Sequence, residues 1–115
     1  MKRKEYSKKV EAFWDEIKKT RDAGQKEYAR EEDNIFANFD RVASCLKLPR
    51  EKVLMTYLLK HIDGISSYID GHKSQREDVS GRITDAIVYL LLLWAMTEVK
   101  EEEDDDYNPW TTTTT

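Results

Sequence analysis

The stretch VLMTYLLKHIDGISSYI, residues 53 to 69, decides the fold of this chain of 115 residues. Apolar side chains recur in it at intervals of three and four residues, the period of one face of an α-helix. The members of this face are Val53, Leu54, Tyr57, Leu58, His61, Ile62, Ile65, Tyr68 and Ile69. Asp70 and Gly71 follow as a stop signal, because glycine tolerates the left-handed conformation that ends many helices. The pattern predicts a regular helix that opens at Pro49, a residue favoured at the start of helices.

Two apolar patterns precede this helix. The first covers residues 7 to 28, with Val10, Phe13, Trp14 and Ile17 on one stripe. The second covers residues 34 to 47, and we expect Asp33 or Asn34 to cap it. Its expected core face consists of Ile35, Phe36, Phe39, Val42, Ala43 and Leu46. Cys45 is the only cysteine and lies at an apolar position, so we expect a small core residue in a reducing compartment.

A fourth helix is predicted from about Val79 into the acidic segment that follows. Its middle, residues 86 to 96, is apolar on every side. At 100° per residue one stripe holds Val79, Ile83, Ala86, Ile87, Leu90 and Trp94, and the opposite stripe holds Asp85, Tyr89, Leu92 and Met96. We expect the chain's own bundle to cover the first stripe and a partner subunit to cover the second. This predicts a homodimer or a higher homo-oligomer.

These patterns predict an all-α, four-helix bundle-like single domain over residues 1–98. An acidic, threonine-rich tail of low complexity follows over residues 99–115, and we expect it to be disordered or to dock on a partner. The net charge of −4 argues against a general nucleic-acid binder. The apolar run 86–96 is too short to span a bilayer, and the start of the chain lacks a signal-peptide pattern. We therefore expect a cytoplasmic protein without membrane contact.

Two polar residues lie where the helical patterns predict burial. His61 is central to the apolar face of residues 53 to 69, where an imidazole acts as a base, a ligand or a hydrogen-bonded core residue. Asp85 begins a strongly apolar helix, and a buried carboxylate requires a partner. The partner is either Arg82 in an ion pair, or a metal or ligand. Gly64, at the margin of the apolar face, predicts the close approach of another backbone.

Charged residues near the loop between the last two helices suggest two further sites. Lys60, Lys73 and Arg76 flank this loop and are suited to hold a phosphate, although a solvated loop explains them equally. The carboxylates of Glu32, Asp33, Glu77 and Asp85 are of the kind that Mg²⁺ prefers, although helix caps and solvated turns also use them. Glycine-rich phosphate loops, zinc-ligand spacings and nucleophile motifs do not occur in the sequence.

Three segments in this order resemble the phage and bacterial nucleotide modification associated domain family, which is itself similar to MazG-like all-α nucleotide pyrophosphohydrolases. They are QKEY (25–28) through NIFANF (34–39), LLKHID (58–63) and EDVSGRITDAIVY (77–89). In the last segment Glu77, Asp85 and Tyr89 match the family pattern. Arg82 departs from it, because MazG-like enzymes place a metal-binding Glu three residues before the Asp, and the first acidic motif, at Glu32 and Asp33, is incomplete.

The resemblance implies a dimeric, phage-type helical protein that handles nucleotides. With the departure at Arg82, it predicts binding of a nucleotide or nucleotide-derived signal without turnover and without a cofactor. The implied phosphate contacts are Arg82, Lys60, Lys73 and Arg76, with Asp85 beside them, and the implied base or ribose contacts are Tyr57, His61 and Tyr89. One alternative is a Mg²⁺-dependent pyrophosphohydrolase with Asp85, Glu77, and Glu32 or Asp33 as ligands. Another is an inhibitor that binds a host defence protein through the acidic tail.

Overall fold

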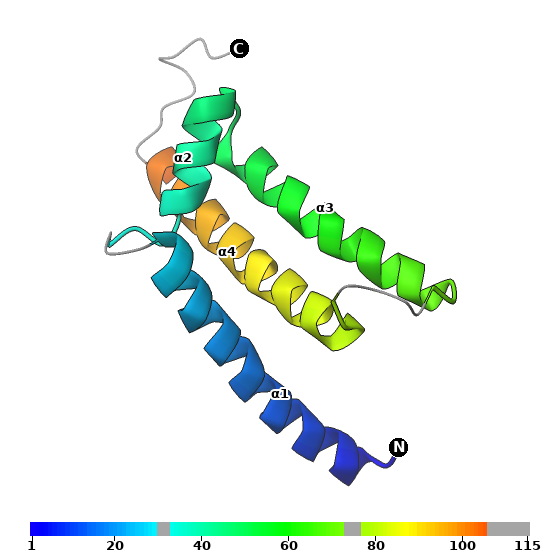
Figure 1. The fold of residues 1–115 in the computed structure, drawn as a ribbon. Coiled ribbons are helices and arrows are strands. Elements are labelled where there is room, and N and C mark those ends of the chain that lie inside the picture. Colours follow the sequence, from blue (N-terminus) through cyan, green and yellow to red (C-terminus); the bar gives the residue numbers. More distant parts are fainter. Residues whose placement is uncertain (30–32, 73–76, 106–115) are drawn as a thin grey trace.

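The computed structural model describes residues 1–29, 33–72 and 77–105, and every regular element in these ranges is a helix. The helices are α1 (Arg3–Gly24), a π-helical turn (Gln25–Ala29), α2 (Ala37–Leu46), α3 (Arg50–Ile69) and α4 (Val79–Asp105) (Figure 1). The prediction of an all-α protein is confirmed.

The boundaries of α3 follow from its flanking residues. Pro49 is the N-cap, with an extended backbone, and its carbonyl accepts hydrogen bonds from the first turn. At the other end Gly71 adopts a φ of 101°, and the amide of His72 donates to the carbonyl of Ser67 at 3.0 Å. This is the left-handed helix stop that the sequence predicts.

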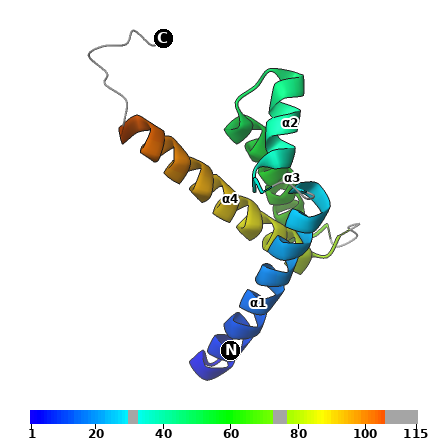
Figure 2. The same cartoon turned by 90° about the vertical axis from the view of Figure 1, so that its left-hand side faces the viewer.

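Helix α4 is the centre of the arrangement. It contacts α3 along much of its length and α1 near its own N-terminal end, whereas α1 and α3 share no contact. Figure 2 shows that α4 starts beside α1 and that the C-terminal end of α4 lies away from α1. The radius of gyration is 17.6 Å, against about 13 Å for a compact chain of this length. The described helices therefore form a more open structure than a closed four-helix bundle.

The main core lies between α2, α3 and α4. Its buried side chains are Phe36, Phe39, Val53, Leu54 and Met96. Three aromatic rings continue this core toward the middle of α3 and α4. Phe39 meets Tyr57 and Tyr89 edge-on, and Tyr57 stacks on Tyr89 with 6.1 Å between ring centroids.

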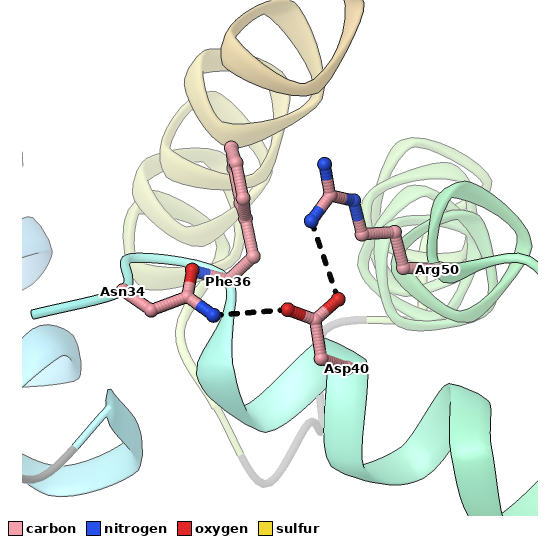
Figure 3. Close-up of polar contacts among 4 residues, drawn as sticks. All are labelled: Asn34, Phe36, Asp40 and Arg50. Atoms are coloured by element: carbon pink, nitrogen blue, oxygen red, sulfur yellow. Dashed lines mark hydrogen bonds and ion pairs between the residues drawn. The ribbon is translucent and has the colours of Figure 1, made fainter. Parts of the chain in front are cut away.

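Polar contacts fix the start of α2 against the start of α3 (Figure 3). The side-chain amide of Asn34 donates to Asp40 at 3.0 Å, and Arg50 pairs with the same carboxylate at 3.3 Å. The guanidinium group of Arg50 also lies 4.4 Å from the ring centroid of Phe36. Asn34 accepts a hydrogen bond from the amide of Phe36, so it organises the turn before α2 without being the N-cap itself.

Several side chains that the sequence assigns to the core are exposed. Cys45 and Leu46 lie at the exposed end of α2, and Trp14 on α1 and Ile35 before α2 are also exposed. The prediction of a core cysteine was wrong. Helix α2 is short, and it contacts α3 and, through Phe39, the Tyr89 ring of α4. Its last turn is not covered by the described part of the chain.

The C-terminal halves of the two stripes of α4 are exchanged relative to the prediction, whereas Ala86 of the first stripe is buried as expected. Met96 is fully buried, and Tyr89 and Leu92 pack against the core, although we expected a partner subunit to cover them. Leu90 and Trp94, expected in the chain's own bundle, are 51% and 62% exposed. Both stripes carry apolar side chains, and the rings of Phe39 and Tyr57 pack against the stripe that contains Tyr89.

The segment Val79–Val99 of α4 is long and apolar enough, by length and composition, to cross a membrane. It is longer than the run 86–96 on which the prediction of no membrane contact was based. Core helices of soluble proteins share these properties, but most of this segment is not buried by the rest of the described chain. The exposed apolar face of α4 is therefore a surface of the kind that contacts protein or lipid in other proteins.

Candidate functional site

The candidate site lies where the middle of α3 faces the start of α4. His61 projects from α3, one turn beyond Tyr57, and its ring centroid is 5.7 Å from that of Tyr89. The residue is 6% exposed. Burial follows from its position on the apolar face of α3, and the stacked tyrosines fix one side of the imidazole.

Two carboxylates flank the imidazole of His61. Glu77 Oε2, from the residues just before α4, is 3.9 Å from Nδ1, and Asp85 Oδ2 is 3.7 Å from Nε2. Both distances exceed a hydrogen bond. The Nδ1 atom is buried, and no group in residues 1–29, 33–72 or 77–105 forms a hydrogen bond with it. One ligand atom from each of the three residues lies within 4.8 Å of the others, a spacing compatible with a shared metal ion.

The electrostatics of the site centre on Asp85. Burial raises the pKa of its carboxyl above the ordinary value, and the neighbouring Glu77 carboxylate raises it as well. His61, Lys60 and Arg82 act in the opposite direction. The cations near Asp85 therefore do not offset the cost of burying its charge, and an added cation would stabilise the carboxylate.

Arg82 reaches the site across the surface of α3. A Cβ atom built on Gly64 would overlap the guanidinium group of Arg82, so the absence of a side chain at residue 64 makes room for it. The sequence predicts that Gly64 admits another backbone. The prediction of close approach is right, but the group that approaches is a side chain.

An open groove adjoins the site on the side of α1, with a volume of about 360 Å³. Its lining residues are Phe13, Glu16 and Thr20 from α1, and Asp78, Ser80, Gly81, Thr84 and Asp85 at the start of α4. Asp78 also accepts a hydrogen bond from the amide of Gly81 at 3.0 Å and so caps α4. Asp85 belongs both to the groove and to the group with His61 and Glu77.

The structure brings together only part of the predicted site. His61, Glu77 and Asp85 converge, Lys60 and Arg82 act on the same carboxylate, and Tyr57 and Tyr89 support the imidazole from the core. Asp33 is exposed and does not belong to the metal-capable group. Three predicted residues, Glu32, Lys73 and Arg76, lie outside the described residues.

Sequence reasoning missed the groove. Its polar lining includes Glu16 and Thr20 on α1, and Ser80 and Thr84 on α4. Each pair is spaced four residues apart, which places both members on one helical face. That spacing was a usable signal, but nothing in the sequence tells which face of α1 meets α4.

The chain matches no protein-family model, no curated protein and no solved structure. The resemblance to the nucleotide modification associated domain family therefore stays a prediction.

Proposed function

We propose that the protein binds a nucleotide or nucleotide-derived small molecule at the groove between α1 and the start of α4, without turning it over. The observation that carries the proposal is the placement of two cations, Arg82 and Lys60, around an aspartate that also lines a ligand-sized groove. Pockets for small ligands typically have volumes of about 300 to 1,000 Å³.

The charges around the groove favour one orientation of such a ligand. Glu16 and Asp78 line its α1 side and would repel a phosphate, but carboxylates accept hydrogen bonds from ribose hydroxyls and base amino groups. Arg82 and Lys60 lie at the α3 side of Asp85 and suit the phosphate. In this orientation the sugar or base occupies the groove, and the phosphate lies toward α3.

A thermal-shift screen of the purified chain against nucleoside phosphates, dinucleotides and cyclic nucleotides tests the proposal. A ligand at 100 times its dissociation constant stabilises the folded state by about 2.7 kcal/mol. Each hit should be recovered unchanged by chromatography. Arg82→Gln and Lys60→Gln should weaken binding, whereas the exposed Lys52→Gln on the same helix as Lys60 should not. A complete absence of hits would contradict the proposal.

A second candidate is Mg²⁺-dependent pyrophosphohydrolysis of a nucleoside triphosphate. It is favoured by the convergence of Glu77 and Asp85, since paired carboxylates hold the metal that activates water in such reactions. It requires pyrophosphate release that EDTA abolishes and that Asp85→Asn removes. The arginine at residue 82, in place of an acidic ligand, favours binding over hydrolysis.

We also propose that the protein is a homodimer in the cytoplasm of a phage-infected host, where it would sequester a host nucleotide or defence signal. The exposed apolar residues on α4 and the open arrangement of the helices support the dimer. The alternative of an inhibitor that binds a host protein through the tail concerns residues 100–115, whose side chains lie outside the described part of the chain.

A further inference from the structure

We propose that His61, Glu77 and Asp85 form a binding site for a divalent first-row transition-metal ion of the Mn²⁺ to Zn²⁺ series. The inference needs only these three side chains, and it does not depend on nucleotide binding.

The geometry of the group leaves space for an ion. The two His61 contacts, 3.7 Å from Nε2 to Asp85 and 3.9 Å from Nδ1 to Glu77, are too long for hydrogen bonds, and they involve different ring nitrogens, of which one ion binds only one. One ligand atom from each of the three residues lies within 4.8 Å of the other two. Two ligand atoms on one tetrahedral metal, with bonds of about 2.1 Å, lie about 3.4 Å apart. Small rotations of the two partly exposed carboxylates would close the remaining difference.

The buried imidazole gives the stronger reason. The ring of His61 is more than nine-tenths buried, and its Nδ1 atom faces the Glu77 carboxylate without a hydrogen-bond partner among the described residues. Buried polar atoms are nearly always satisfied, so an orphaned nitrogen aimed at carboxylates indicates an absent partner. A metal ion bound to Nδ1 would supply it, and Nε2 would donate its proton to the Asp85 oxygen that does not bind the metal, as metal-bound histidines commonly donate their second N–H to a carboxylate.

The donor set selects the class of metal. Mg²⁺ and Ca²⁺ are held by oxygen ligands, whereas imidazole nitrogen suits zinc and its neighbours in the first transition row. One imidazole and two carboxylates make three protein ligands, which leaves at least one coordination position for water or a ligand oxygen.

Titration of the tag-free chain with Zn²⁺ in a calorimeter, and with Co²⁺ by visible absorption, tests the site. We expect one Zn²⁺ per chain, and Mg²⁺ should bind at least tenfold more weakly. Glu77→Gln and Asp85→Asn keep the side-chain shapes and should each lower zinc affinity at least tenfold. His61→Gln should do the same and should remove the nitrogen contribution from the Co²⁺ spectrum.

Matched controls separate this site from adventitious binding. His72→Gln removes the other histidine of the chain, which is exposed beyond the end of α3, and Asp63→Asn removes an exposed carboxylate from α3. Both should leave zinc affinity unchanged. The proposal is overturned if the wild-type chain binds no zinc, or if the controls lose as much affinity as Glu77→Gln. It is also overturned if ¹⁵N NMR finds His61 protonated on both nitrogens and unaffected by zinc, since the ring is then an imidazolium paired with two carboxylates.

Discussion

The guanidinium group of Arg82 occupies the space that a side chain at residue 64 would fill, and Gly64 provides that space. The two residues come from different helices, Gly64 from α3 and Arg82 from α4. Together they place a fixed positive charge on the surface of α3 beside Asp85. This contact links the packing of α3 and α4 to the proposed ligand site.

Replacing Gly64 with alanine should separate binding from stability. The added Cβ would displace the flexible end of Arg82, while alanine favours the helix by about 1 kcal/mol, so the free energy of unfolding should change by less than about 1 kcal/mol. Affinity for a nucleotide hit should fall about tenfold, because a charge-assisted hydrogen bond is lost. Gly81→Ala in α4 is the control: a Cβ there meets nothing within 4 Å, so stability should rise slightly. Equal binding by Gly64→Ala and wild type would exclude Arg82 as a phosphate contact.

The pH dependence of stability should reveal the cost of burying the charged carboxylate of Asp85. Because burial raises its folded pKa above the ordinary value of 3.8, the folded protein holds this proton more tightly than the unfolded chain. That stabilisation is fully present below pH 3.8 and is lost as the pH rises through the raised pKa. Asp85→Asn should therefore gain stability relative to wild type as the pH rises over this window.

Urea unfolding in EDTA, from pH 3.5 to pH 7, measures this difference at Asp85. Asp63→Asn controls for the removal of an exposed carboxylate. With zinc present, wild type should be more stable to urea than Asp85→Asn at neutral pH, the reverse of their order in EDTA, because the metal stabilises the Asp85 anion. A stability difference independent of pH would contradict the raised pKa.

The core between α2, α3 and α4 should be sensitive to truncation. Leu54 is fully buried against Phe39 and Met96, so Leu54→Ala should lower the free energy of unfolding by about 2 to 5 kcal/mol. Leu46→Ala makes the same chemical change at a residue that is 58% exposed, and it should cost far less. Chemical denaturation followed by circular dichroism compares the two. Similar losses would mean that the end of α2 is covered in solution.

The exposed face of α4 should control assembly. Trp94→Glu adds a charge to the apolar surface formed by Leu90 and Trp94, and it should convert the proposed dimer to a monomer in analytical ultracentrifugation. Ile69→Glu, at the end of α3, introduces the same charge at a residue that is 74% exposed and should leave assembly intact. A monomeric wild-type chain that floats with lipid vesicles would instead assign α4 to a membrane.

The sequence by itself determined the helices, because hydrophobic periodicity, Pro49 and the Asp70–Gly71 stop are local signals that act within a few residues. It also singled out His61 and Asp85, since polar groups within apolar runs require partners wherever the chain folds. Only the tertiary structure decided which stripe of α4 is buried, why Cys45 is exposed, and that Arg82 lies over Gly64. The convergence of His61, Glu77 and Asp85 was likewise decided by the packing of α3 on α4. These features depend on how two helices are rotated and offset against each other, and helical periodicity alone does not specify either quantity.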